Sequence, residues 1–147
     1  MKAKNTKEAI ARILDNKDCF TSFWEHFDGS DIDTVVSELD KREANYLIIK
    51  TDRYIEETLK YLERFEANGI PSCWYFREDI RSVDVLVIYG YETIGLYQEL
   101  FETMIVHDIN SRKGLLKKTV LATSGSFDSV ISEKLKNMMT ARTILSC

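Results

Sequence analysis

The sequence contains few of the residues that usually signal special architecture or chemistry. Among its 147 residues are one proline, six glycines, three cysteines and two histidines. So little proline and glycine excludes a fibrous or low-complexity chain. Cys19, Cys73 and Cys147 form no CxxC pair and have no closely spaced histidines. The sequence therefore predicts neither a disulfide framework nor a metal site.

Long apolar runs are absent as well. The longest run is about seven residues, far short of the roughly 20 that a membrane-spanning helix requires. The first residues also lack the apolar core of a signal peptide. We therefore expect one globular domain over residues 1–147, located in the cytoplasm and without membrane contact.

Charge is unevenly distributed along the chain. The net charge is −4, but residues 18–111 contain 20 acidic and eight basic residues. Because the summed charge of a surface steers association, this segment predicts a face that attracts a basic protein partner. The seven basic residues of 112–147 are scattered, so direct nucleic-acid binding is not expected. An ordinary solvated acidic surface is the alternative.

The pattern of apolar residues predicts alternating strands and helices in the middle of the chain. The four predicted strands are 45–51, 72–78, 84–91 and 115–122, and the two predicted helices between them are 53–68 and 92–110. The connection 80–83 is short enough to join neighbouring antiparallel strands. The β-α-β-β-α-β order is typical of a ferredoxin-like α+β fold, with a four-stranded sheet and both helices on one face. Two helices before this core and one after it complete the prediction, and a three-layer α/β sheet is the alternative.

Four aromatic residues lie within the eight residues 20–27. Their spacing is that of one face of a helix, and such a stripe is usually part of a core. Acidic residues surround the stripe, so a second interpretation is a surface on which aromatics anchor a partner and charges steer it. The residues predicted for partner binding are Phe23, Trp24, Phe27, Asp28, Asp31 and Asp33.

A turn of small residues, 123–129, joins the last predicted strand to a helix. Exposed amides at a helix N-terminus can hold a phosphate or a carboxylate. The candidate anion-binding residues are Lys118, Ser124, Gly125 and Ser126. An ordinary capped turn is the alternative. The sequence contains neither of the common nucleotide-binding patterns, G-x-x-x-x-G-K-[ST] and G-x-G-x-x-G.

No catalytic set and no resident metal or cofactor is predicted, although the sequence leaves open whether the protein is an enzyme. The leading hypothesis is a small acidic binding or regulatory protein that inhibits or modulates a macromolecular partner, in the manner of immunity and inhibitor proteins. In one version of this hypothesis the acidic face mimics nucleic acid. The alternative is a ligand-binding or enzymatic domain with an anion site at the 123–129 turn. The sequence does not predict the oligomeric state.

Overall fold

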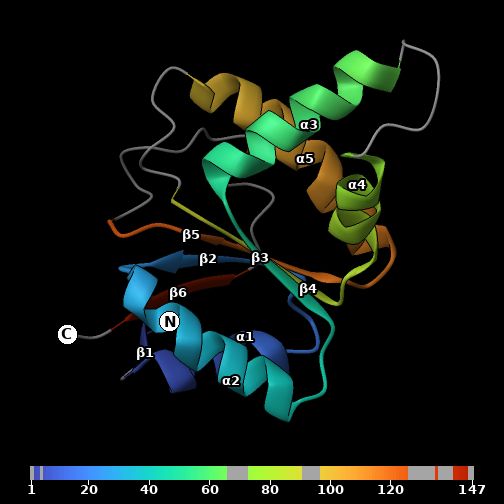
Figure 1. The fold of residues 1–147 in the computed structure, drawn as a ribbon. Helices are drawn as coiled ribbons and strands as arrows, with labels where there is room; N and C mark the ends of the chain where they lie inside the picture. Colours follow the sequence, from blue (N-terminus) through green and yellow to red (C-terminus); the bar gives the residue numbers. More distant parts are fainter. Residues whose placement is uncertain are drawn as a thin grey trace.

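A computed structural model of the chain describes residues 2–3, 5–65, 73–90, 97–125, 135 and 141–145. A six-stranded parallel sheet lies between two layers of helices (Figure 1). The strands are β1 (Lys2–Ala3), β2 (Thr21–Glu25), β3 (Tyr46–Lys50), β4 (Val85–Tyr89), β5 (Lys118–Ala122) and β6 (Ala141–Leu145). The helices are α1 (Thr6–Asp15), the short 3₁₀ helix η1 (Gly29–Asp31), α2 (Ile32–Lys41), α3 (Thr51–Phe65), α4 (Cys73–Ser82) and α5 (Gln98–Gly114).

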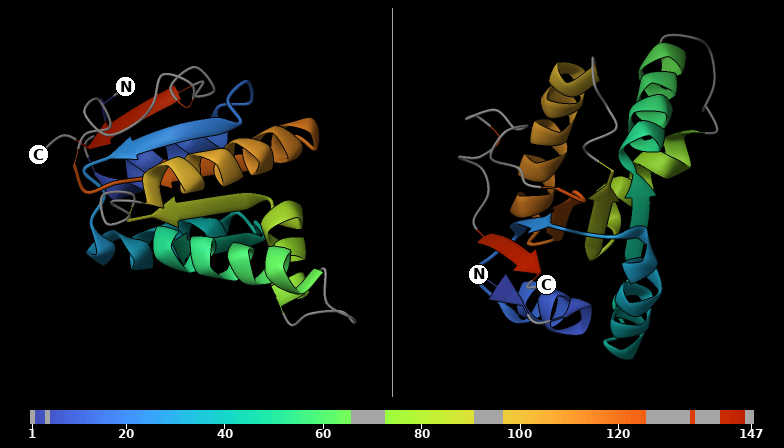
Figure 2. Two further views of the ribbon diagram at one scale, coloured as in Figure 1. Left: turned by 90° about the horizontal axis from the view of Figure 1, so that it is seen from above. Right: turned by 90° about the vertical axis from the view of Figure 1, so that its left-hand side faces the viewer.

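The strand order is β1-β6-β2-β5-β4-β3, which places β2 inside the sheet. Trp24 of β2 is in register with Ala122 of β5 on one side and with Thr143 of β6 on the other. Helices α1 and α2 cover one face, and α3, α4 and α5 cover the other (Figures 1 and 2). Parallel neighbours need such helical crossovers, because a tight turn cannot join them. None of the helices in the described ranges is long and apolar enough to cross a membrane.

The predicted ferredoxin-like fold is wrong, because every strand pairing is parallel and helices cover both faces of the sheet. The error begins at 72–78, which was predicted as a strand, whereas the structure forms α4 there. Within α4, half-buried Phe76 and buried Ile80 are one helical turn apart. The connection 80–83 is therefore the end of a helix rather than a turn between antiparallel strands. The three-layer α/β sheet, which the sequence left as the alternative, describes this architecture.

Two hydrophobic cores lie on the two faces of the sheet. Successive side chains of a strand point to opposite faces, so Phe23 packs with the α3–α5 layer and Trp24 with the α1–α2 layer. Leu86 and Val87 of β4 divide between the two cores in the same way. A strand that is buried on both faces carries a continuous apolar run rather than an alternating one. This explains the sequence Val-Leu-Val-Ile in β4.

Candidate functional site

A pocket of about 490 Å³ lies where four neighbouring strands end. Lys50 and Tyr89 are the last residues of β3 and β4, and the remaining lining follows the ends of β2, β4 and β5. In open α/β sheets, ligands bind at the carboxyl ends of the strands. The described lining consists of His26, Phe27, Asp28, Gly29, Lys50, Tyr89, Gly90 and Ser124. This pocket, called the carboxyl-edge pocket below, is the candidate functional site.

The backbone at the end of β2 turns sharply at the pocket rim. His26 has a φ of 59°, in the left-handed region that residues with a side chain seldom adopt. Its amide donates to the Gly125 carbonyl (3.2 Å), and the Phe27 amide donates to the Thr123 carbonyl (2.8 Å). These bonds hold the turn against the end of β5 and leave the imidazole exposed at the rim. Such conformations cluster at binding sites, where the surrounding structure offsets their cost.

Three aromatic rings lead from the core to the pocket. The Trp24 and Phe27 ring centroids lie 5.1 Å apart in an edge-to-face arrangement, and those of Phe27 and Tyr89 lie 5.8 Å apart. Trp24 and Phe27 are buried, whereas Tyr89 is half-buried and lines the pocket. Aromatic pairs with these geometries are favourable contacts. The Tyr89 ring is therefore a supported platform that faces the pocket.

The charges of the described lining are few and mixed. Lys50 supplies an exposed ammonium group and Asp28 an exposed carboxylate. The Thr51 hydroxyl donates to the Tyr89 carbonyl (2.8 Å) and so ties the start of α3 to the end of β4 beside the pocket. Within the described part of the chain, no three His, Cys, Asp or Glu side chains are grouped so that they could hold a metal ion.

The three aromatic residues predicted for partner binding lie in the core. The exposed fractions of Phe23, Trp24 and Phe27 are 4%, 0% and 4%. The helical spacing of these residues was misleading, because 21–25 is a strand and its side chains divide between both faces of the sheet. None of the three is available as an exposed anchor for a partner.

The three aspartates of the same prediction lie around the turn that follows β2. Asp28 lines the carboxyl-edge pocket, Asp31 is half-buried, and Asp33 is exposed in the first turn of α2. The structure therefore separates the predicted surface into a buried aromatic part and an acidic turn.

The candidate anion-binding residues lie at opposite edges of the sheet. Ser124 lines the carboxyl-edge pocket and Gly125 contacts its rim through the His26 amide, whereas Ser126 lies outside the described residues. Lys118 is at the first position of β5, and its ammonium group donates to three carbonyl oxygens at the end of α1 and the start of β2. These acceptors belong to Ile13 (3.0 Å), Asn16 (2.6 Å) and Cys19 (2.7 Å). Lys118 therefore caps α1 and does not lie with the 123–125 turn.

Sequence reasoning missed Lys50, Tyr89 and His26 as members of one site. Lys50 and Tyr89 stand near the ends of the predicted strands 45–51 and 84–91, which was the available signal. The predicted ferredoxin-like order places 45–51 parallel to 84–91, as β3 and β4 are in the structure, and so keeps Lys50 and Tyr89 together. In that fold 115–122 runs antiparallel to them, which places Ser124 at the opposite end of the sheet. Only the parallel order brings Lys50 and Tyr89 together with Asp28 and Ser124, which had been assigned to two different sites.

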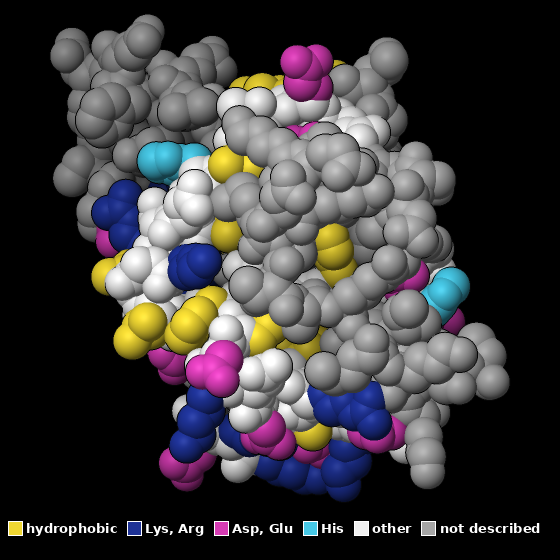
Figure 3. Space-filling view, turned by 180° about the vertical axis from the view of Figure 1, so that it is seen from behind, with side chains coloured by type: hydrophobic (Ala, Val, Ile, Leu, Met, Phe, Trp, Pro, Cys, Tyr) yellow, Lys and Arg dark blue, Asp and Glu magenta, His cyan; other side chains and the backbone are white. Residues whose placement is uncertain are grey.

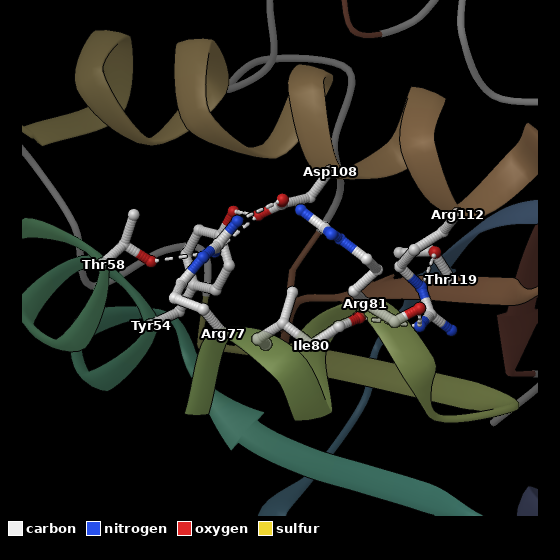
Figure 4. Close-up of polar contacts among 8 residues, drawn as sticks. All are labelled: Tyr54, Thr58, Arg77, Ile80, Arg81, Asp108, Arg112 and Thr119. Atoms are coloured by element: carbon white, nitrogen blue, oxygen red, sulfur yellow. Dashed lines mark hydrogen bonds and ion pairs between the residues drawn. The ribbon is translucent and has the colours of Figure 1, made fainter. Parts of the chain in front are cut away.

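A buried polar network joins the three helices on one face of the sheet (Figure 4). The Arg77 guanidinium donates to both carboxylate oxygens of Asp108, at 2.5 and 2.9 Å, and to the Thr58 hydroxyl. The Tyr54 hydroxyl donates to the same carboxylate. Burial first, and then the Asp108 charge, raise the pKa of Tyr54 well above its ordinary value. Because these residues come from α3, α4 and α5, the network fixes the mutual positions of the helices.

The raised pKa of Tyr54 predicts a loss of stability at alkaline pH. The neutral phenol is favoured in the folded state, so its contribution is complete below the unfolded pKa of about 10 and is lost as the pH rises through the folded pKa. Tyr54→Phe does not titrate, so its unfolding free energy is expected to decline less steeply above about pH 10 than that of the wild type. Urea unfolding at a series of alkaline pH values measures both slopes. Parallel plots of unfolding free energy against pH for the two proteins would contradict this prediction. Tyr97→Phe, at an exposed position, is the control and should keep the slope of the wild type.

Charged side chains of both signs are interspersed on the face shown in Figure 3. Lys and Arg side chains lie beside Asp and Glu side chains along its lower part. On the α1–α2 layer, Arg12 pairs with Glu8 and Arg42 pairs with Asp15, each at 2.5 Å. Lys117, from outside residues 18–111, pairs with Asp84 at 2.8 Å, so folding brings at least one such basic side chain against the acidic segment.

Comparison with known proteins finds similarity in structure but not in sequence. No protein-family model and no curated protein matches the sequence. The replication initiator DnaA bound to AMPPCP and single-stranded DNA matches with a TM-score of 0.71 and 16% identity, over 94% of this chain and 44% of that one. Domain III of the Thermotoga maritima replication initiation protein DnaA matches with a TM-score of 0.71 and 14% identity, over 94% and 60%. A DNA replication initiation factor matches with a TM-score of 0.68 and 17% identity, over 95% of this chain and 43% of that one.

The chain spans roughly half the length of these structures, and at such low identity the likeness establishes the fold. Two sequence-based interpretations are corrected by it. The structural neighbours are replication initiators rather than inhibitor or immunity proteins, so the hypothesis of an acidic inhibitor is contradicted. The expectation that nucleic acid is not a partner is contradicted by the same neighbours. The chain has the three-layer α/β fold that occurs in DnaA replication initiators.

Proposed function

We propose that this protein is a DNA-replication domain that binds single-stranded nucleic acid in the carboxyl-edge pocket. The observation that carries the proposal is the supported Tyr89 ring beside Lys50, at the sheet edge where ligands bind in α/β folds. A structural neighbour, the replication initiator DnaA, was solved with AMPPCP and single-stranded DNA, which supports nucleic acid as the class of ligand.

Base stacking on Tyr89 supplies the main attraction in this proposal. Every base has a π face, so a strand of any sequence can stack on an aromatic side chain, at about 1–3 kcal/mol per base. The Tyr89 ring is already held by Phe27, which is held in turn by Trp24. Binding therefore orders few groups that were previously free, and more of the stacking energy remains as affinity. The exposed His26 imidazole on the rim offers a second ring.

The charges of the pocket suit one phosphodiester at a time. Lys50 is the ammonium group of the described lining, and it can neutralise one phosphate of a strand. The Asp28 carboxylate can accept hydrogen bonds from the amino groups of a base, as acidic side chains do from cytosine. Because the whole chain carries a net charge of −4, long-range attraction to nucleic acid is weak and stacking must dominate.

Tyr89→Ala is expected to weaken the binding of an oligothymidylate by about 5- to 150-fold, because it removes the stacking energy of one base. Tyr89→Phe keeps the ring and should bind nearly as well as the wild type. Fluorescence anisotropy of a labelled strand, titrated with each protein, measures the dissociation constants. Tyr97→Ala is the matched control, since Tyr97 is 59% exposed and lies outside the pocket lining.

The same titration at several salt concentrations tests the role of Lys50. One phosphate contact predicts a slope of only about −0.7 in a plot of log affinity against log salt, and Lys50→Glu should flatten it. Exposed Lys113→Glu makes the same charge change near the end of α5, and the slope should then stay as in the wild type. Equal affinities for Tyr89→Ala and Tyr97→Ala, with thermal unfolding showing both proteins folded, would refute the proposed site.

A further inference from the structure

The turn after β2 holds carboxylates where a phosphate-binding turn holds phosphate. In nucleotide-binding α/β folds, a glycine-rich turn leads from a strand into a helix whose free amides and lysine bind phosphates. In this protein the turn that leads from β2 into α2, residues 26–31, contains one glycine and no lysine, and two of its residues are aspartates. Two neighbours of this fold were solved with AMPPCP, a triphosphate analogue. Whether this turn can bind a triphosphate therefore depends on the groups that its own amides contact.

The amides of the turn are already bonded to groups of the protein itself. The Ser30 amide donates to the Asp28 carboxylate (3.1 Å), and the Asp28 amide donates to the Asp31 carboxylate (2.9 Å). The Asp31 amide donates to the Asp28 carbonyl (2.8 Å). This reciprocal arrangement is a capping box, in which two side chains satisfy the donors at a helix start. A phosphate group would have to displace both carboxylates to reach these amides.

Helix α1 fixes the same turn from the other side. The Thr6 hydroxyl donates to the second oxygen of the Asp31 carboxylate at 2.6 Å. Asp31 thus joins the first turn of α1 to the entrance of α2 while it caps the Asp28 amide. Groups of the protein itself therefore satisfy the amides of Asp28, Ser30 and Asp31. Asp28 also lines the carboxyl-edge pocket, so its negative charge faces any anion that enters there.

We infer that this domain holds nucleic acid without a nucleoside triphosphate, because the Asp28 and Asp31 carboxylates exclude a triphosphate from the turn. The part of this inference that concerns the strand rests on the proposed function. The residues present do not fit a magnesium triphosphate: the described pocket lining offers one ammonium group, Lys50, against several phosphate charges. One ammonium group can neutralise the single charge of a phosphodiester, but it cannot neutralise the several charges of a triphosphate.

The test uses the full chain, isotope-labelled, in two separate titrations followed by amide resonances. With inorganic tripolyphosphate, the resonances of residues 28–32 should stay unmoved in the wild type. Asp28→Gly with Asp31→Ala frees the Asp28 and Ser30 amides and removes two negative charges, and saturable shifts at these amides should then appear. Glycine is tolerated at the N-cap at only a small cost in stability relative to aspartate. Wild-type shifts on addition of tripolyphosphate, or a folded double variant that still fails to respond, would overturn the exclusion by carboxylates.

The second titration measures oligothymidylate affinity with and without the magnesium complex of AMPPCP. The two affinities should agree within about twofold, and a change of about fivefold or more, the lower end of ordinary allosteric coupling, would show that a triphosphate is bound. Absence of any oligothymidylate binding would defeat the proposed function instead. The tripolyphosphate titration would then still decide whether the turn excludes a triphosphate, so the two failures are distinguishable.

Discussion

Trp24→Ala is expected to lower the free energy of unfolding by about 3–5 kcal/mol, the usual cost of truncating a buried tryptophan. Trp24 is fully buried in β2 and packs edge-to-face on Phe27, 5.1 Å between centroids. Its neighbours in the sheet, β5 and β6, cannot move into the space because their backbones are hydrogen-bonded to β2. The free-energy cost of the lost contacts and the cost of the unfilled cavity therefore add. Since domains are stable by about 5–15 kcal/mol, the variant should be marginally folded.

Urea unfolding followed by circular dichroism measures this change. Trp24→Phe should cost much less, because it keeps a ring and removes an indole N–H that has no hydrogen-bond partner among the described residues. Tyr97→Ala, at an exposed position, should stay within about 0.5 kcal/mol of the wild type. If Trp24→Ala unfolds at the wild-type midpoint, Trp24 is not the core residue that the structure shows.

Arg112→Met is expected to cost about 3 kcal/mol or more, although methionine keeps most of the apolar stem. The Arg112 guanidinium is fully buried and donates to the Ile80, Val83 and Lys118 carbonyls at 2.7–2.8 Å, and to the Thr119 hydroxyl at 2.9 Å. Figure 4 shows the bonds to Ile80 and Thr119. Burial lowers the pKa of Arg112 to about 10, so the group stays charged at neutral pH. Its removal takes this donor from the buried carbonyl oxygens of Ile80 and Val83 and from the part-buried one of Lys118, and a buried oxygen left unsatisfied costs about 1–3 kcal/mol.

The matched control for Arg112 is the next residue in the chain. Lys113 is exposed on the last turn of α5, so Lys113→Met removes the same charge without removing a buried donor. In calorimetric unfolding, the melting temperature of Arg112→Met should lie well below that of Lys113→Met. The melting temperature of Arg112→Lys should lie between them, because an ammonium group can restore some of the bonds. Hydrogen exchange should quicken first at the end of α4, where the Ile80 carbonyl loses its donor. Equal melting temperatures for the two methionine variants would contradict this account.

The sequence predicted three strands of the sheet well. The predicted strands 45–51, 84–91 and 115–122 match β3, β4 and β5, because strands covered on both faces are continuous apolar runs. The predicted helix 53–68 corresponds to α3, whose buried Tyr54 and Ile55 begin its apolar face. These elements were visible because burial alone sets their pattern.

Two elements were misassigned because short aromatic segments suit either structure. The segment that forms α4 begins Cys-Trp-Tyr-Phe, a run with high strand propensity, and only the later Ile80 indicates a helix. Conversely, β2 places Phe23 and Trp24 on opposite faces, but with Phe20 and Phe27 they fit a helical spacing. In β2, tertiary contacts decide the structure, and Glu25 is 2% exposed in the middle of the sheet, which no local pattern predicts.

The candidate site was less predictable than the fold because it depends on strand order. Asp28 and Ser124 were each singled out, but for different sites on different surfaces. Lys50 and Tyr89 join them only when β3, β4, β5 and β2 are parallel neighbours in that order. Local sequence carries information about the ends of strands and very little about which ends are adjacent.

The position of β2 in the sheet has a consequence during synthesis. This strand is complete at Glu25, yet the strands that flank it begin at Lys118 and Ala141. At about 5–20 residues per second, the nascent chain carries β2 without either neighbour for roughly 5–20 s. Such distant pairings also close slowly, because the chain between them must first be ordered. The centre of the sheet is therefore assembled last, and until then its aromatic side chains are open to chaperones and to other unfinished chains.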